Sequence, residues 1–540
     1  MATHEVINQP PPLEEYNLFS SDPVLPEAVR RTGAGWAADQ LVELGRLAGS
    51  AEAIAWGFEA NENPPVLRTH DRFGHRIDRV DYHPSYHRLM ETAVRAGLHA
   101  APWTTDRPGA HVARAAGFYV WSQVEAGHGC PVSMTYSVVP ALAASDELTA
   151  EWKPRLTSVT YDPRPAPAEE KAGAIAGMAM TEKQGGSDVR ANTTRAEPDG
   201  AGGDYRLTGH KWFCSAPMSD VFLMLAQSRK GLSCFVVPRW TPAGERNAIF
   251  IQRLKDKLGN RSNASSEIEM DAAWGRLLGE EGRGVATIME MVQHTRLDCV
   301  IGAAAGMRQA VTQAIHHARH RRAFGADLVD QPLMRNVLAD MAVESHAATA
   351  LMIRLATAYD RAGSDDHERA FRRLATAVGK YWVCKRNPGL AAEALECLGG
   401  SGYVEESIMP RLFRESPLNG IWEGSGNVIA LDVLRTMARE PQAVEAFIDE
   451  LRMSGGADSR FDAALSGLEK ELADPDDFEM RARRVVEQMA LALQGALLLR
   501  DGGPVADAFC ASRLGADWGG AYGTLPSRVE TAAILDRALP

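Results

Sequence analysis

The sequence predicts a multidomain α+β protein in which a helical domain, a compact β domain, a helical bundle and a helical extension follow one another. Apolar residues recur at helical spacing through the first and third parts, whereas the second part consists of short β-branched and aromatic runs separated by Gly, Pro and Ser. The length of 540 residues also favours two to four domains, because one hydrophobic core rarely grows that large.

The N-terminal part is expected to begin as an arm and continue as helices. Residues 1–34 are rich in Pro, Asn and Glu, which favours an extended arm, and residues 35–165 form the predicted N-terminal helical domain. Helical segments fit Ala113–Ala126 and Val138–Leu148. Between the helices, His70–His83 reads as a polar loop, and its three histidines favour surface residues over a metal site because no Cys or tight ligand pair accompanies them.

The β domain is predicted at residues 166–283, after a Pro- and Glu-containing linker at Ser158–Lys171. Several short strands at close intervals are typical of a compact β domain. The predicted strands are Tyr205–Phe213, Val221–Ala226, Ser233–Pro238, Ile249–Leu254 and Ser266–Met270.

Helices return in a predicted bundle at 284–439 and in an extension at 440–540, where Asp476–Arg500 is the clearest helix. Ala-rich faces suit close helix packing in the bundle. The predicted bundle helices are Val285–Arg322, Leu333–Gly363, His367–Asn387 and Ile429–Arg439.

Composition excludes some classes of protein. No run of eighteen or more apolar residues occurs, and the first twelve residues lack the features of a signal peptide, so a cytoplasmic protein is expected. Seven scattered cysteines without CxxC or zinc spacing fit a reducing compartment and no metal site. The net charge of −12 argues against a surface that is basic all over, although a local basic patch stays possible.

Two glycine clusters, Glu396–Tyr403 and Asn419–Asn427, form the most informative stretch of the bundle. The second cluster places Glu423 between two glycines and beside Ile421 and Trp422. Glycines let the backbone approach a bulky ligand, and apolar neighbours raise the pKa of a carboxyl toward that of a useful base. The alternative is a glycine-rich helix connection with a solvated carboxylate.

Five motifs in order resemble the acyl-CoA dehydrogenase flavoprotein family over residues 35–438. They are Met178-Ala-Met-Thr-Glu-Lys-Gln-Gly-Gly-Ser-Asp-Val189, Gly209-His-Lys-Trp-Phe-Cys-Ser215, Arg321-Arg-Ala-Phe-Gly325 with Gln331, Gly399-Gly-Ser-Gly402 and Trp422-Glu-Gly-Ser425. The stretches 70–78, 180–189 and 419–427, the overall length and the added C-terminal block are most similar to the AidB-type adaptive-response branch. The resemblance implies an acyl-CoA dehydrogenase-like fold, with an N-terminal helical domain, a middle β-barrel, a C-terminal four-helix bundle and an extra C-terminal helical block.

The resemblance also implies FAD as the cofactor and a homo-oligomer, a homotetramer built as a dimer of dimers. One group of matched residues would contact the flavin ring and pyrophosphate, and a second group would hold the other end of FAD across a subunit interface. Ordinary strand core is the alternative for the two aromatics, surface charge for Arg321, and a solvated helix end for Glu396, where the family commonly has Gln. The implied cofactor residues are Met178, Met180, Thr181, Ser187, Trp212, Phe213, Ser215, Arg321, Phe324, Gln331, Glu396, Gly399, Gly400, Gly402, Trp422, Gly424, Ser425 and Asn427.

Glu423 matches the catalytic base of the family, which takes the proton α to a thioester carbonyl while a hydride leaves the β-carbon. Some members place the base just before a matched Arg, but here that neighbour is Thr295, which cannot act as a base. Arg296 matches a residue that bonds near the base or the substrate.

Three interpretations of the function stay open. The AidB-like resemblance implies a flavoprotein that binds double-stranded DNA in the response to alkylation damage, with weak acyl-CoA dehydrogenase activity. The alternative is a true dehydrogenase for short or branched acyl-CoA that passes electrons to an external acceptor and has no DNA role. Candidate DNA contacts are Arg481, Arg483, Arg484 and Arg513, but residues 440–540 hold ten Lys and Arg against eighteen Asp and Glu. Leu491, Leu493 and Leu497–Leu499 could instead mark an oligomerisation element.

Overall fold

A computed structural model describes residues 3–200, 202–474 and 476–539. The chain divides into two compact units, each built from more than one segment. Unit 1 comprises Met1–Ala51, Arg107–Val124 and Arg296–Pro540, and unit 2 comprises Glu52–Asp106 and Glu125–Thr295.

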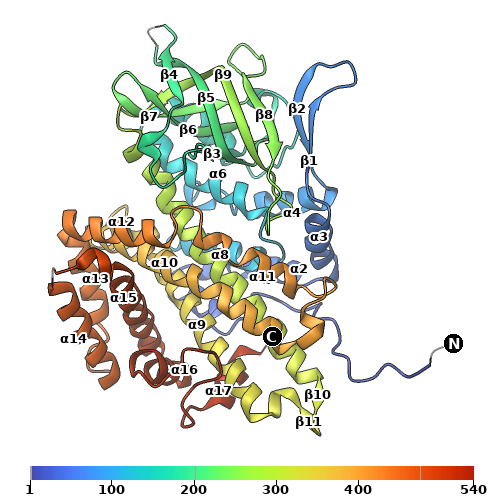
Figure 1. Ribbon diagram of the computed structural model, residues 1–540, viewed down its shortest axis with the longest axis vertical. Helices are drawn as coiled ribbons and strands as arrows, with labels where there is room; N and C mark the ends of the chain where they lie inside the picture. Colours follow the sequence, from blue (N-terminus) through green and yellow to red (C-terminus); the bar gives the residue numbers. More distant parts are fainter. Residues whose placement is uncertain (1–2, 201, 475, 540) are drawn as a thin grey trace. The chain divides into compact units, whose positions relative to one another are not determined.

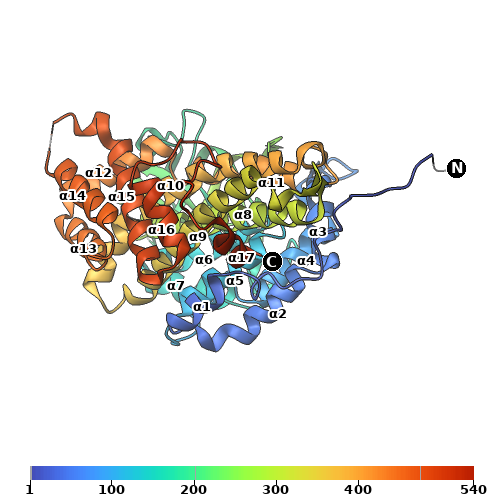
Figure 2. The ribbon, with the colours of Figure 1, turned by 90° about the horizontal axis from the view of Figure 1, so that it is seen from below.

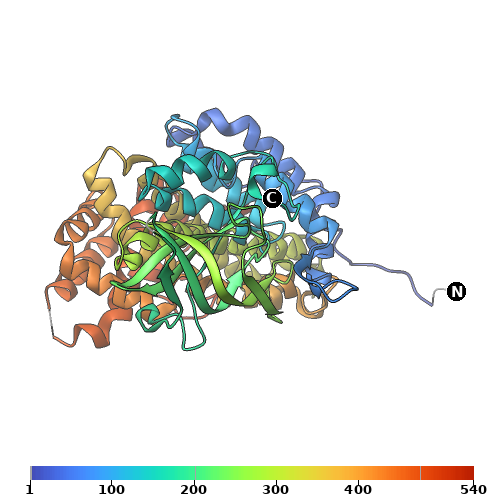
Figure 3. The same cartoon turned by 90° about the horizontal axis from the view of Figure 1, so that it is seen from above.

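Unit 2 contains a seven-stranded sheet that closes on itself (Figure 3, green). The strand order is β3-β6-β4-β5-β9-β7; β8 pairs with β9, and β7 also pairs with β6, which closes the barrel. Apolar side chains from alternate positions of these strands fill its interior. The strands are β3 (Ala176–Ala179), β4 (Arg195–Pro198), β5 (Asp204–Ser215), β6 (Val221–Ser228), β7 (Gly231–Pro238), β8 (Ile249–Leu254) and β9 (Ser265–Leu278).

The expected loop at His70–His83 is in part a β-hairpin, formed by β1 (Val66–His70) and β2 (Arg76–Asp81) (Figure 1). The polar sequence does not predict the strand β2, because one of its polar residues, Asp78, is buried. The Asp78 carboxylate accepts hydrogen bonds from Arg76 and from the main chain of β8. The remaining helices of unit 2 are α3 (Ala51–Glu62), α4 (Pro84–Arg95), α6 (Gly129–Leu142) and α7 (Asp146–Leu156).

Unit 1 is a helical bundle (Figure 2). Long helices α9 and α10 pack against each other, and α10 also packs against α12. The helix α8 begins in unit 2 and continues into unit 1. The helices are α1 (Leu25–Arg31), α2 (Ala38–Ala48), α5 (Ala110–Ser122), α8 (Gly284–His320), α9 (Pro332–Arg361), α10 (Asp366–Cys397), α11 (Met409–Glu415) and α12 (Gly426–Arg439).

Two helices of unit 1 differ from the expectation. The predicted arm contains α1, which begins where Asp22 accepts from the main-chain N–H groups of Val24 and Leu25. The helix α10 continues ten residues beyond the predicted end at Asn387, because Pro388 costs one hydrogen bond while the following turns stay buried against the bundle.

The C-terminal extension belongs to the same unit as the bundle. Its helix α15 packs against α9, α10, α12 and α14, and it agrees with the helix predicted at Asp476–Arg500. The extension helices are α13 (Pro441–Arg452), α14 (Ser459–Ala473), α15 (Phe478–Asp501), α16 (Pro504–Phe509) and α17 (Thr531–Ala538).

Short turns of 3-10 or π type connect these elements. They are η1 (Gly35–Ala37), η2 (Ala101–Trp103), η3 (Ala168–Glu170), η4 (Val189–Ala191), η5 (Leu328–Asp330), η6 (Gly399–Gly402), η7 (Leu418–Gly420) and the π turn η8 (Cys510–Leu514); β10 (Arg322–Ala323) and β11 (Ala326–Asp327) form a small hairpin.

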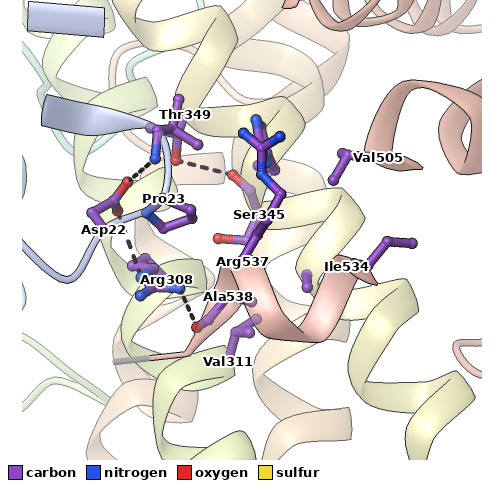
Figure 4. A pocket seen from close by; sticks show the side chains of 13 residues that line it. Asp22, Pro23, Arg308, Val311, Ser345, Thr349, Val505, Ile534, Arg537 and Ala538 are labelled. Carbon is purple, nitrogen blue, oxygen red and sulfur yellow. Dashed lines mark hydrogen bonds and ion pairs between the residues drawn. The ribbon is translucent and has the colours of Figure 1, made fainter. Parts of the chain in front are cut away.

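A small cavity lies in unit 1 under the C-terminal helix α17 (Figure 4). Arg308 closes one side of it by donating to the main-chain oxygens of Ser21 and Ala538, at 3.0 Å each. This contact ties the C-terminal helix to the N-terminal segment. In the described part of the chain no helix is long and apolar enough to cross a membrane, and no group of three His, Cys, Asp or Glu side chains could hold a metal ion.

Candidate functional site

Unit 2 brings the first two predicted cofactor motifs together. Met180 and Thr181 directly follow β3, and Trp212 lies in β5. The main-chain N–H of Trp212 donates to the Thr181 oxygen at 2.8 Å. A side chain on Gly186 would meet the Thr181 hydroxyl at 2.6 Å, so glycine is required for the loop to fold back here.

A buried ion pair fixes this arrangement. Lys211 donates to Glu182 at 2.9 Å, and neither side chain is exposed. Glu182 also accepts from the main chain of Thr193 and Thr194. Burial alone would raise the pKa of Glu182, but the Lys211 ammonium and these hydrogen bonds lower it to about 2. The carboxylate therefore stays ionised and anchors the loop beside β5.

The aromatic pair on β5 forms a partly exposed platform. Trp212 is half-buried and Phe213 is exposed, so neither is an ordinary barrel-core residue. The ammonium of Lys255 lies 3.2 Å from the centre of the Trp212 ring, in a cation–π contact. The hydroxyls of Ser215 and Ser265 lie 3.1 Å apart, Met178 is half-buried in β3, and Ser187 is exposed in the following loop.

Unit 1 places Glu423 in a constrained turn just before α12. Glu423 has a φ of 57° and Gly424 a φ of 107°, both in the left-handed region. This conformation is unfavourable for a residue with a side chain and costs on the order of 1–3 kcal/mol. The surrounding structure therefore has to hold it.

Arg296 supplies one of the contacts that hold this turn. Its Nε donates to the main-chain oxygen of Glu423 at 3.1 Å, and its Nη1 donates to Asp432 at 2.6 Å. Arg373 also bonds to Asp432, at 3.2 Å. Burial alone would raise the pKa of Asp432, but the two guanidinium groups outweigh it and lower the pKa. Arg296 therefore contacts the main chain of Glu423, the residue that the sequence predicts as the base.

The N-terminus of α12 is suited to an anion. Ser425 stands at the cap position, and its side chain makes no capping hydrogen bond, so it does not compete with an anion for the first N–H groups of the helix. Asn427 lies in the first turn and is exposed. Trp422 donates from its ring nitrogen to the side chain of Asn419 at 2.9 Å.

The motif at Arg321 forms an exposed hairpin whose base is tied to the N-terminal arm. Arg321 donates to the main-chain oxygen of Asn8 at 2.5 Å, and the Asn8 side chain bonds to the main chain of Arg322. Phe324, with a φ of 51°, is 98% exposed, and Gln331 donates to the main-chain oxygen of Ala323.

The glycine cluster after α10 serves two different purposes. Side chains at Gly399 or Gly400 would meet nothing within 4 Å, so these positions leave room for a ligand. A side chain on Gly402 would lie 2.4 Å from the Leu395 oxygen, so this glycine is required by packing. Glu396 is exposed. Among the described residues, no hydrogen bond or ion pair joins this cluster to the Arg321 hairpin.

The four candidate DNA contacts do not form one group. Arg513 is 8% exposed and bonds to Asp340 at 2.5 Å and Glu344 at 3.2 Å, so we remove it from the predicted DNA contacts. Arg481 and Arg484 share Glu471, at 2.6 Å and 3.6 Å, and Arg483 bonds to a tyrosine of α10.

The leucines proposed for oligomerisation are largely used inside unit 1. Leu493, Leu497 and Leu498 are buried on the inner face of α15, and they pack in the protein's own core. They are therefore not available as a surface for a second copy.

Three supporting residues escaped the sequence reasoning: the ion-pair partner Lys211, the platform lysine Lys255 and Lys380, which donates to the main-chain oxygen of Gly424. Lys211 lies inside the motif Gly209–Ser215. A charged residue at a strand position that faces the interior could have indicated a buried ion pair. No sequence signal separates the other two from surface lysines.

Three family models match consecutive parts of the chain. The N-terminal domain of the adaptive response protein AidB matches residues 8–163, the middle domain of acyl-CoA dehydrogenases matches residues 177–273, and their C-terminal domain matches residues 282–438.

Relatives extend over nearly the whole chain. The AidB protein of Escherichia coli (strain K12), which is named as an acyl-CoA dehydrogenase, is 48% identical to this chain over 94% of each of the two chains. Acyl-CoA dehydrogenase family member 11 of Caenorhabditis elegans is 28% identical over 90% of this chain and 84% of its own. The crystal structure of Caenorhabditis elegans ACDH-11 in complex with C11-CoA superimposes with a TM-score of 0.85 at 26% identity, over 99% of this chain and 93% of that one.

Proposed function

This chain belongs to the acyl-CoA dehydrogenase family and is AidB-like, and we propose that it oxidises acyl-CoA thioesters with FAD, using Glu423 as the base. The observation that carries the proposal is the position of Glu423, a half-buried carboxylate in a left-handed turn whose main chain a buried arginine holds.

The residues present fit FAD, the cofactor of this family. The aromatic platform of β5 offers a flat apolar surface, and the loop after β3 lies beside it. The uncapped N-terminus of α12 and the open glycines Gly399 and Gly400 suit phosphate groups and a closely approaching ligand. We therefore assign Met178, Met180, Thr181, Trp212, Phe213 and Ser215 of unit 2 to the flavin ring, and Ser187 of the same unit to the pyrophosphate. Trp422, Gly424, Ser425 and Asn427 of unit 1 are assigned to further contacts with the cofactor.

When bound, the flavin would supply a two-electron acceptor for the hydride from the β-carbon of the thioester. Glu423 would take the proton from the α-carbon, and the buried pair Arg296–Asp432 would keep its main chain in place.

An acyl-CoA thioester is the substrate class that we propose. The complex of the nematode relative with C11-CoA supports this class, because its fold matches this chain over nearly its full length. Short and branched thioesters belong in the same test, since nothing in the described residues fixes the chain length.

The direct test is to load the purified full-length chain with FAD and add acyl-CoA thioesters of increasing length without oxygen. The proposal expects saturable loss of the oxidised flavin absorbance with at least one thioester. Tight FAD binding without bleaching by any of them would contradict dehydrogenation while leaving the flavoprotein assignment intact.

Double-stranded DNA is a second candidate ligand, supported by the 48% identity to AidB and by the adaptive-response domain at residues 8–163. With Arg513 removed, the candidate contacts with DNA are Arg481, Arg483 and Arg484 on α15. Arg484 keeps 67% of its side chain accessible in its ion pair, against 20% for Arg481.

A salt titration of duplex binding tests this role, because phosphate contacts weaken steeply with salt. Neutralising Arg484 together with Arg481 should reduce both the affinity and its salt dependence, whereas Arg528→Gln, on an exposed loop, should not. Salt-independent binding, or none, would remove DNA from the function.

We also propose that the chain forms a homo-oligomer, in which a second copy covers the Arg321 hairpin and the glycine cluster. Large apolar side chains are exposed at both places: Phe324 at 98%, Leu333 at 82% and Tyr403 at 80%. Mass measurement in solution tests the proposal, and a Phe324→Asp variant should shift the mass toward the monomer.

A further inference from the structure

A buried lysine in α10 holds the turn that carries the proposed base. Lys380 is 1% exposed, and its ammonium donates to the main-chain oxygen of Gly424. Its neighbours are poor partners for a charge: Cys299 and Cys384 are buried, and the Cys384 thiol donates to the Cys299 oxygen. Among the residues that the structure describes, no carboxylate forms an ion pair with Lys380.

Burying an ammonium without a counter-charge costs stability, so packing alone does not account for this lysine. Arg296, the other cation at the turn, is balanced by Asp432. Lys380 differs because it donates to a neutral acceptor, the main-chain oxygen of Gly424. Its ammonium therefore holds the main chain of the turn through the Gly424 oxygen.

The two cations hold successive peptides. Arg296 donates to the oxygen of Glu423, and Lys380 donates to the oxygen of Gly424. These are the two residues with left-handed backbone angles, 57° and 107°. Fixing both carbonyls fixes the direction in which the Glu423 side chain leaves the backbone.

The next residue of α10 lies beside the start of α12, which follows the turn. Tyr381 Cε2 lies 3.5 Å from the position that a side chain on Gly426 would take, and the Tyr381 hydroxyl accepts from Arg483 of α15 at 3.1 Å. The C-terminal extension thus braces α10 where α10 contacts the turn.

We infer that Lys380 is a positioning residue for the proposed base, acting through the Gly424 carbonyl, and that Tyr381 and Arg483 brace it from the C-terminal extension. The inference rests on the proposed function of Glu423. It gives Arg483 a role inside the fold that needs no DNA.

Flavin bleaching by a saturating acyl-CoA tests the inference in the FAD-loaded chain. Lys380→Met should lower the limiting rate about 10- to 100-fold, because small misplacements of a catalytic group have effects of this size. The half-saturating concentration should change little, and Lys380→Arg should recover much of the rate. Lys470→Met, which removes an exposed lysine of α14, is the matched control and should behave as wild type.

Hydrogen exchange of residues 418–428 supplies a readout that needs no activity. In the unloaded protein, Lys380→Met should speed exchange in this segment and leave residues 430–439 unchanged. If wild type bleaches with no thioester, the proposed function fails, while the exchange result still decides on Lys380.

Two results would overturn the inference. One is that Lys380→Met has the same limiting rate of flavin bleaching as wild type and the same rate of hydrogen exchange in residues 418–428. The other is a lower bleaching rate in Lys380→Met that is fully explained by a lower FAD content or a lower melting temperature of the variant. Should Lys380→Met not fold, Lys380→Gln takes its place, and a wild-type limiting rate in that variant would be equally contrary.

Discussion

At the scale of single residues, the buried pair Glu182–Lys211 joins two positions that are 29 residues apart in the sequence. Both side chains are fully buried, and each makes further bonds to the main chain. We expect Glu182→Gln to lower the free energy of unfolding of unit 2 by about 3–5 kcal/mol, because the substitution leaves a buried ammonium without its counter-charge. Denaturant unfolding followed by tryptophan fluorescence measures this.

The control replaces both partners, as in Glu182→Leu with Lys211→Met. Removing the whole pair should cost clearly less than breaking it, since no uncompensated charge remains. A double variant as unstable as Glu182→Gln would show that the pair itself, not the unpaired charge, sets the stability.

The same pair predicts an acid response. The pKa of Glu182 is about 2 in the folded chain against an ordinary value of 4.5. A group with a lowered folded pKa contributes stability that is fully present above 4.5 and is lost as the pH falls toward 2. Melting temperatures over this range should fall more steeply in wild type than in the double variant.

At the scale of elements, His346 on α9 makes the packing of α17 sensitive to pH. Burial lowers its pKa from 6.5 to about 4, and the nearby charges of Arg537 and Arg308 also lower it, against the opposite effect of Asp22 and Asp501. Because the unfolded chain binds the proton first, stability should fall between about pH 6.5 and pH 4.

Differential scanning calorimetry over this range tests the prediction, with His346→Gln as the comparison. That variant should lose part of the pH dependence. An identical slope in both proteins would show that His346 titrates alike in the folded and the unfolded chain, so that burial does not lower its pKa.

The docking of the C-terminal extension rests on Arg513, which bonds to both Asp340 and Glu344 of α9. Arg513→Ala should destabilise unit 1 by about 3–5 kcal/mol, because the buried Asp340 loses this cation, while Glu344 keeps its ion pair with Arg386. Limited proteolysis should then cut the 510–530 segment first, whereas Arg528→Ala, on the exposed loop, should leave the pattern unchanged.

Several elements with strong apolar patterns were predicted from the sequence, but the predicted helix Val138–Leu148 is wrong, because α6 ends at Leu142 and Ser145 caps the start of α7. The strand Ile249–Leu254 and the helix near Asp476–Arg500 follow from local pattern alone. The β1–β2 hairpin depends on the hydrogen bonds that the buried Asp78 carboxylate accepts. The continuation of α10 past Pro388 depends on tertiary packing. Neither is visible in local sequence.

At the scale of the whole molecule, the predicted order of helical, β and helical parts is confirmed by the structure and the family models. The motif residues were identified by resemblance, but their supports were not. Lys380 and Lys255 differ from surface lysines only through contacts between distant parts of the chain.

The central claim is that Glu423 takes a proton from an acyl-CoA thioester. The most direct measurement is rapid-mixing of the FAD-loaded chain with a thioester that bleaches wild type, in Glu423→Gln and in the control Glu406→Gln, an exposed glutamate. Loss of a general base predicts a rate at least about 100-fold lower for Glu423→Gln at unchanged FAD content. A wild-type rate in Glu423→Gln would contradict the account.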